Sequence, residues 1–289
     1  MPTKVEKDEI TGQNTTGHEW DGIKELNTPL PKWWLYTFYV CIIYSVIWWI
    51  LYPSWPYVTG YFGGVLGSNQ RVELDERLAT AKAAQAQYFD RIQAASADEI
   101  IADPELLSFA VAGGQAAFAD NCAPCHALGG AGQGPYPTLA DDDWIWGGTL
   151  DDIHQTINYG IRSTHEETRF NEMPAFGRDE ILTREDVDAV ANYVVGLSGG
   201  DHDAALAENG AVIYQEQCAA CHGEQGEGMQ ELGAPNLSDQ IWLYGGSEEA
   251  IAQQIYAPQQ GVMPAWTGRL DEETIKILTV YVHTLGGGQ

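Results

Sequence analysis

Two short cysteine and histidine motifs are the stretches of this 289-residue chain best suited to holding a redox group. They are Cys122-Ala-Pro-Cys125-His126 and Cys218-Ala-Ala-Cys221-His222. On a helical turn, positions i, i+3 and i+4 lie on one face, so two thiols can bond to porphyrin vinyl groups while the imidazole reaches the iron. A single Cys-x-x-Cys can instead bind zinc or act as a redox dithiol. Two complete Cys-x-x-Cys-His motifs predict two covalent haem c groups.

The surroundings of the two motifs also repeat. The offset is 96 residues for the haem motifs, 98 for the loops that follow them, and 90 falling to 88 towards the end of each copy. The matched pairs are Gly114 and Gly210, Phe118 and Tyr214, Pro137 and Pro235, Trp144 and Trp242, Trp146 and Tyr244, Met173 and Met263, and Tyr193 and Tyr281. An offset that drifts this little indicates one duplicated domain.

The same repeat predicts the axial ligands of both irons. His126 and His222 are the expected proximal ligands. Of the four methionines, at positions 1, 173, 229 and 263, only Met173 and Met263 occupy equivalent places, each before Pro-Ala. Thioether sulfur is a soft ligand, and His/Met ligation raises the potential of haem iron. We therefore predict Met173 and Met263 as the distal ligands, and the sequence leaves open whether each binds the iron of its own repeat.

Four other residues compete for the distal position. Met229 follows His222 by seven residues, too near the proximal side to cross the haem plane. The rival histidines are His154, His165 and His283, and none of them recurs in the other repeat. We expect all four to be ordinary surface or half-buried residues.

The loops after the haem motifs are expected to support the proximal histidines. Pro137 and Pro235 follow these histidines by eleven and thirteen residues. A carbonyl in each loop can accept the imidazole Nδ1–H and so fix the tautomer. The aromatic residues that follow can line the haem edge or belong to the core, and the sequence does not decide between these roles for Trp144, Trp146, Trp242 and Tyr244.

Helices are expected to hold these residues in place. Each repeat should begin with a helix that ends at its haem motif and close with a helix, at 184–197 and at 272–285, before a run of glycines. A glycine and an aromatic residue four positions later on each first helix predict a small-residue notch that meets an aromatic residue of the last helix. No segment shows strand alternation, so we predict an all-α fold, with one haem-binding domain at 108–200 and a second at 204–289.

A membrane span precedes the repeats. Residues 33–52 are twenty residues without a formal charge, bracketed by Pro31 and Pro53 and edged with Trp and Tyr. A buried helix or a cleaved signal peptide is the alternative, but Met1 is present and no small-residue cleavage site follows. Lysines before the span place 1–32 as a cytoplasmic tail without regular structure, 53–107 as a periplasmic helical linker and the haem domains in the periplasm.

Charge and the fifth cysteine narrow the function further. The formal net charge is -27, and residues 53–289 hold 10 Lys+Arg against 35 Asp+Glu. This field disfavours nucleic acid and favours basic partners. Cys41 lies within the span and is left over once four cysteines bind haem, so we expect it to be an inert packing residue and expect no disulfide.

These motifs together carry a family resemblance. The two halves resemble class I cytochrome c domains, and the whole chain resembles the membrane-anchored dihaem cytochrome c subunit of cbb3-type cytochrome c oxidases. The matching stretches are Asn27-Thr-Pro-Leu-Pro-Lys-Trp-Trp34, Gly233-Ala-Pro-Asn-Leu-Ser-Asp239 with Trp242-Leu-Tyr-Gly-Gly246, and Tyr281-Val-His-Thr-Leu-Gly-Gly-Gly288.

The resemblance implies an electron-transfer role in the bacterial inner membrane. Electrons from a soluble or tethered donor cytochrome c would pass through the two haems to a monohaem cytochrome c subunit and then to the haem-copper catalytic subunit. This chain itself would hold neither the oxygen site nor a proton channel. Two other classes stay open: a dihaem cytochrome subunit of a periplasmic dehydrogenase, and a dihaem peroxidase, against which the paired methionines and the anchor argue.

Overall fold

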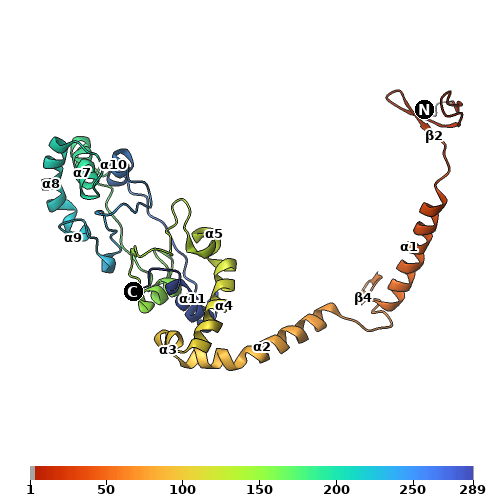
Figure 1. The fold of residues 1–289 in the computed structure, drawn as a ribbon, viewed down its shortest axis with the longest axis horizontal. Helices are drawn as coiled ribbons and strands as arrows, with labels where there is room; N and C mark the ends of the chain where they lie inside the picture. The colour runs from red at the N-terminus through yellow and green to blue at the C-terminus, as the bar shows by residue number, and fades with distance from the viewer. Residues whose placement is uncertain (1–3, 289) are drawn as a thin grey trace. The chain divides into compact units, whose positions relative to one another are not determined.

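The computed structural model describes residues 4–288, and they are mostly helical. The chain divides into two compact units, with the boundary between Ala84 and Gln85 (Figure 1). Elements that begin in the first unit are β1 (Thr15–Trp20), β2 (Ile23–Leu26), α1 (Lys32–Leu51), β3 (Pro56–Tyr57), β4 (Gly60–Tyr61) and α2 (Gln70–Ala94). The second unit contains α3 (Ala97–Ala102), α4 (Pro104–Asn121), α5 (Ala123–His126), η1 (Leu128–Gly130), α6 (Leu150–Tyr159), α7 (Arg184–Leu197), α8 (Ala204–Gln217), α9 (Ala219–His222), η2 (Gln230–Leu232), α10 (Glu248–Tyr256) and α11 (Glu272–His283).

The N-terminal segment contains a β-hairpin, which corrects the expectation of an irregular tail at 1–32. Strands β1 and β2 pair in antiparallel fashion. Asp21 and Gly22 connect them with φ of 46° and 85°. Positive φ at both central residues is typical of the two-residue turns that match strand twist, and Asp-Gly is a strong signal for them. A second short hairpin, β3 with β4, lies in the Gly-rich stretch after α1. Residues 1–3 lie outside the described part.

Helix α1 agrees with the predicted span to within one residue at each end. It is the one helix in residues 4–288 that is long and apolar enough to cross a membrane, and none of its side chains is buried within the chain. Cys41 lies on this helix and is exposed.

Hydrogen bonds stabilise the ends of the helices that lead into the repeats. Ser96 and Glu99 form a reciprocal capping box at the start of α3. Lys276, on α11, donates through Nζ to the carbonyls of Ile92, Gln93 and Ala95 at 3.0, 3.1 and 2.8 Å. A cation at the C-terminal end of α2 satisfies carbonyls that have no partner within the helix.

The two sequence repeats exchange their C-terminal helices, so that each cytochrome-like core contains the last helix of the other repeat. In the first core, α4 and α6 of the first repeat pack with α11 of the second repeat. In the second core, α8 and α10 of the second repeat pack with α7 of the first. Figure 1 shows α11 beside α4, and α7 with α8 and α10. The predicted all-α architecture is confirmed apart from the two small hairpins, but each core combines parts of both repeats.

Glycine notches allow the exchanged helices to approach closely. A Cβ at Gly114 of α4 would overlap Tyr281 of α11, and a Cβ at Gly210 of α8 would overlap the backbone of Ala189 in α7 and approach Tyr193. Phe118 and Tyr281 then contact with ring centroids 5.4 Å apart. The predicted contact between a notch and an aromatic residue is therefore present, and in both cores it joins one repeat to the other.

Candidate haem sites

Both Cys-x-x-Cys-His motifs form the helical turn that their spacing predicts. The carbonyl of Cys122 accepts from the amides of Cys125 and His126 at 3.1 and 2.9 Å. The second motif, on α9, makes the same pair of bonds at 3.0 Å each. The first cysteine of each motif is half-buried and the second is exposed. Each motif therefore presents its two thiols and its imidazole together, as a porphyrin with two thioether bonds requires.

A proline carbonyl orients each proximal histidine, as predicted. His126 Nδ1 lies 3.0 Å from the Pro137 carbonyl, and His222 Nδ1 lies 3.1 Å from the Pro235 carbonyl. These bonds place the proton on Nδ1 and leave Nε2 free as a ligand. Burial lowers the pKa of both imidazoles, which favours the neutral form that binds iron.

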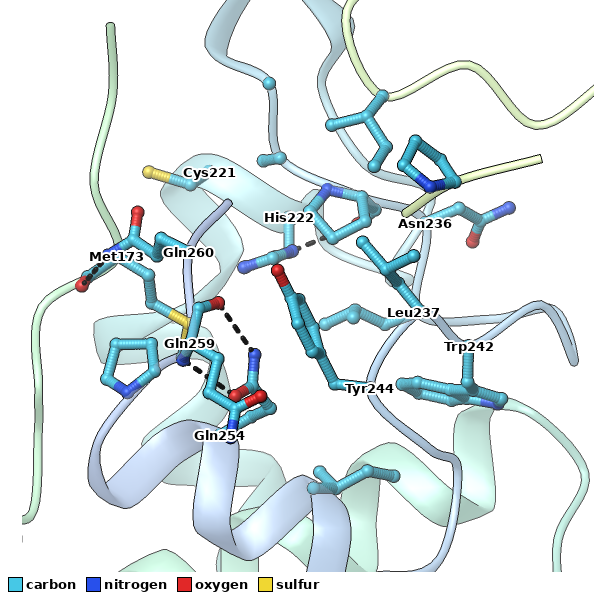
Figure 2. A pocket seen from close by; sticks show the side chains of 18 of the residues that line it. Met173, Cys221, His222, Asn236, Leu237, Trp242, Tyr244, Gln254, Gln259 and Gln260 are labelled. Atoms are coloured by element: carbon cyan, nitrogen blue, oxygen red, sulfur yellow. Dashed lines mark hydrogen bonds between the residues drawn. The ribbon is translucent and has the colours of Figure 1, made fainter. Parts of the chain in front are cut away.

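The second site is an open cavity of about 490 Å³. His222 and both cysteines of its motif line it, and so does Met173 of the first repeat. Figure 2 shows Met173 and His222 directed into the cavity from separate segments of the chain. Apolar residues from α7, α10 and the haem loop form much of its wall, including Val190, Val194, Leu237, Ile251 and Ile255. The methionine expected as a distal ligand thus lies with the haem motif of the other repeat.

The first site shows the same exchange. Met263 and Cys122 both pack against the cluster that contains Phe118 of α4 and Ile153 of α6. Met263 and Ile161 exchange two backbone hydrogen bonds, each 3.0 Å long. The loop that carries Met263 is thereby fixed to the end of α6, in the repeat that carries His126.

Two hydrogen bonds fix the Met173 loop to the second core. Gln260 donates through Nε2 to the Met173 carbonyl at 3.2 Å. The amide of Arg178 donates to the carbonyl of Tyr256, at the end of α10, at 2.9 Å. A Cβ at Gly177 would overlap the Tyr256 ring, so this loop lies directly against α10.

The donor sets suit covalent haem better than zinc. Burial raises the pKa of the Cys122 and Cys218 thiols to about 11, which disfavours the thiolate that zinc and disulfide exchange need. Within residues 4–288 no three His, Cys, Asp or Glu side chains cluster as a metal site would require. Two thiols, one imidazole and one thioether around an apolar wall fit a c-type haem.

The rival ligands do not line the second cavity. Asn158 lies 3.2 Å from the ring nitrogens of His154, and His165 stacks on Tyr159 with centroids 4.8 Å apart. His283 is at the end of α11, and the backbone of Met229 pairs with Ala234. Among the described residues that line the second cavity, His222 is the one histidine and Met173 the one methionine.

The aromatic residues after the haem motifs divide between two roles. Trp242 and Tyr244 line the second cavity. Trp144 instead packs beside the first core and donates through Nε1 to the Gly287 carbonyl at 2.6 Å. Trp146 is buried, with the Arg169 guanidinium 5.6 Å from its ring centroid.

Two polar residues at the sites were not predicted from the sequence. Arg162 lines the second cavity and binds backbone carbonyls near both methionines. Gln260 holds the Met173 loop. They stand in the two segments that lead to Met173 and Met263, where the repeat offset falls from 98 to 90, so the repeat gives no fixed alignment that could have drawn attention to them.

The fold and the sites define a pair of c-type cytochrome units that follow one apolar helix. Family models agree along the chain: the N-terminal domain of cytochrome oxidase-cbb3, FixP, matches residues 12–59, cytochrome c matches 111–198, and cytochrome C oxidase, cbb3-type, subunit III matches 205–282.

The similarity to known proteins extends over nearly the whole length of the chain. The cbb3-type cytochrome c oxidase subunit CcoP of Azospirillum sp. (strain B510) is 52% identical, over 98% of each chain. Subunit FixP of Bradyrhizobium diazoefficiens is 50% identical and subunit CcoP of Cereibacter sphaeroides 45% identical, both over 100% of each chain. The chain therefore belongs to the CcoP/FixP family, the electron-transferring cytochrome c subunits of cbb3-type cytochrome c oxidases. These relatives do not favour the alternative of a dehydrogenase subunit.

Proposed function

We propose that this chain carries two haem c groups with crossed axial ligation. His126 and Met263 would hold the haem attached at Cys122 and Cys125, and His222 and Met173 the haem attached at Cys218 and Cys221. The observation that carries the proposal is the cavity that Met173 shares with the second haem motif. When bound, the haems would supply one-electron redox centres, and thioether ligands would keep their potentials high.

The protein's own residues would prepare each centre. The carbonyls of Pro137 and Pro235 hold the imidazoles in the ligating tautomer. The apolar walls would shield a bound haem from water, which favours the less charged ferrous state of the iron. Electrons would enter from a donor cytochrome c and leave to the monohaem and haem-copper subunits of the oxidase. Co-purification tests this route, because a dehydrogenase subunit would bring a quinoprotein or flavoprotein in place of a copper-containing membrane partner.

We propose that α1 anchors the chain in the bacterial inner membrane, with residues 1–32 cytoplasmic and the haem cores periplasmic. Lys24 and Lys32 precede α1, whereas the first basic residue after it is Arg71. The segment 53–107 would be the periplasmic linker. Residues 108–200 and 204–289 are the two sequence repeats, and the two haem cores are assembled by exchange between them.

Cutting the chain after Asn69 should release a soluble dihaem fragment. The cut precedes α2 and leaves α2 to α11, with both haem motifs and both predicted methionine ligands, in one piece. The visible spectrum should stay that of the full chain, whereas assembly with the oxidase should be lost. Membrane fractionation after a high-salt wash checks this, and a fragment that stayed in the membrane would indicate a second membrane contact.

Reduction by a basic donor cytochrome c should slow as salt rises. The excess of acidic over basic residues beyond α1, 35 against 10, attracts such a donor from a distance. The Debye length is about 8 Å at physiological ionic strength, so added salt should weaken the steering. Stopped-flow reduction over a range of salt measures it, and a rate that stays flat or rises would reject a basic donor steered by this field.

A further inference from the structure

Two chain segments cross between the cores, and each leads to a methionine. Residues 160–173 run from α6 in the first core to Met173 in the second, and residues 257–263 run from α10 in the second core to Met263 in the first. The segments touch where Ile161 pairs with Met263 and where Gln260 binds the Met173 carbonyl. Whatever fixes this crossing also fixes the position of both thioethers.

The Arg162 side chain binds both crossing segments at once. Its Nε donates to the Gly261 carbonyl at 2.7 Å, and its Nη1 donates to the Asn171 carbonyl at 3.0 Å. Gly261 lies two residues before Met263, and Asn171 lies two residues before Met173. One planar guanidinium therefore holds the two methionine loops at equivalent points.

The backbone of Arg162 is also set for this contact. Its φ is 50°, in the left-handed region, which costs an ordinary side chain energy and persists only where surrounding contacts hold it. The neighbouring residue Ile161 supplies those contacts through its two backbone bonds to Met263. The direction of the Arg162 side chain is thus tied to the Met263 loop itself.

A polar residue of the other crossing segment does only half of this. Gln260 stands 98 residues after Arg162, and its side chain binds the Met173 loop alone. An amide has two donor hydrogens on one nitrogen, whereas a guanidinium has a fork of five and can span two carbonyls. Arg162 is therefore the residue that joins the loops.

The charge of Arg162 is directed to these carbonyls. Among residues 4–288, Arg162 has no carboxylate at ion-pair distance, and it is half-buried beside the second cavity. Burial lowers the pKa of the guanidinium, with Tyr244 and Glu172 opposing that shift. Hydrogen bonds from a charged donor are about twice as strong as neutral ones, so the two carbonyls are firmly held.

We propose that Arg162 is a positioning residue that sets both methionine loops together, so that the two haems keep or lose their thioether ligands as a pair. The proposal rests on the crossed His/Met ligation proposed above. It predicts that one substitution in the first repeat weakens distal ligation at both irons, without contact with either haem motif.

The test uses the full chain with both haems attached and the variant Arg162→Gln. The near-infrared charge-transfer band of ferric His/Met haem and the reduction potential of each haem are measured well below the melting temperature. The ratio of methionine-bound to methionine-free iron should fall roughly tenfold at both haems, as expected for the loss of a charge-assisted hydrogen bond at each loop. Arg178→Gln is the matched control, because Arg178 lies in the Met173 loop but pairs with Asp179 at the exposed surface.

The other outcomes are separable. A wild-type protein that lacked either His/Met signature would refute the proposed ligation before any variant was made. If the wild type shows both His/Met signatures but Arg162→Gln changes only one haem, or neither, the positioning role of Arg162 is refuted and the crossed ligation still stands. Should Arg162→Gln fail to retain haem, Arg162→Lys carries the test: it keeps the charge but reaches one carbonyl at a time, so both bands should weaken partially. Unchanged bands in Arg162→Lys would also overturn the proposal.

Discussion

Replacing Met263 with His should alter the haem attached at Cys122 and Cys125, although Met263 belongs to the second repeat. Met263 packs with Cys122 in one core, and its backbone is bonded to Ile161. The covalent attachment should survive, because no cysteine is changed. The near-infrared band of that haem should disappear and its reduction potential should fall, because a nitrogen ligand stabilises ferric iron relative to thioether sulfur.

The size of the fall in reduction potential determines whether the first haem of Met263→His can still accept electrons. A tenfold shift in a one-electron equilibrium corresponds to about 59 mV. A fall of several such steps would stop the first haem from accepting electrons from a high-potential donor, and turnover with that donor should cease. Redox titration followed in the visible region measures the potential, and oxygen consumption by the assembled oxidase measures the turnover.

Which of the two haems each methionine variant affects distinguishes crossed ligation from ligation within one repeat. In a background with Cys218→Ser and Cys221→Ser, only the first haem is attached, and Met263→His should remove its band while Met173→His leaves it. Met229→His is the matched control, because it introduces the same side chain at a methionine that neither lines the second cavity nor packs in the cluster shared by Cys122 and Met263. If Met173→His removed the band of the first haem, the crossed assignment would be wrong and each repeat would close on itself.

The sequence identifies the ligands but not their pairing, and the reason is physical. Duplication makes the contact surfaces equivalent: Gly114 and Gly210 are the same notch, and Tyr193 and Tyr281 are the same aromatic partner. Either helix of one kind can therefore pack on either of the other, and no local pattern favours one choice. Which helices pair depends on the crossing segments, where Ile161 pairs with Met263 and Arg162 donates to the Gly261 carbonyl.

Single-helix features were predictable because their causes are local. The Ser96 and Glu99 capping box, the bounds of α7 and the turn at each haem motif follow from residues within a few positions of one another. The proline carbonyl at each histidine was also expected from loop length. By contrast, Arg162 acts through carbonyls, which every residue possesses, so no residue type marks its acceptors in the sequence.

The N-terminal hairpin was missed for a different reason. Its turn signal, Asp21-Gly22, was present, but strands β1 and β2 are short and mostly exposed, so they lack the alternation of apolar and polar residues that predicts a half-buried strand. For this element the turn residues were the available signal, and periodicity was not.

Substituting one of two adjacent glycines in α4 should test, through the stability of the first core, how closely α4 packs on α11. A Cβ at Gly114 would overlap the Tyr281 side chain and lie 3.0 Å from the Ile277 carbonyl, both on α11. The overlap involves Cβ and backbone atoms, which no side-chain rotation relieves, so α4 and α11 must separate. We expect Gly114→Ala to destabilise the first core by about 2–4 kcal/mol, in the range of severe overpacking.

The neighbouring glycine supplies the control. A Cβ at Gly113 would meet Ile277 Cγ2 at 3.6 Å, an ordinary contact. Gly113→Ala should therefore leave the core unchanged or stabilise it by up to about 1 kcal/mol, because alanine favours helix over glycine. Thermal melting, followed through the His/Met band of the haem at Cys122, compares the two variants. In Gly114→Ala this band should be lost at a much lower temperature, since Met263 moves with α11, whereas the band of the second haem should melt near its wild-type temperature. Equal melting of the two variants would mean that α11 does not pack on α4, and the exchange of halves would then be rejected together with the ligation built on it.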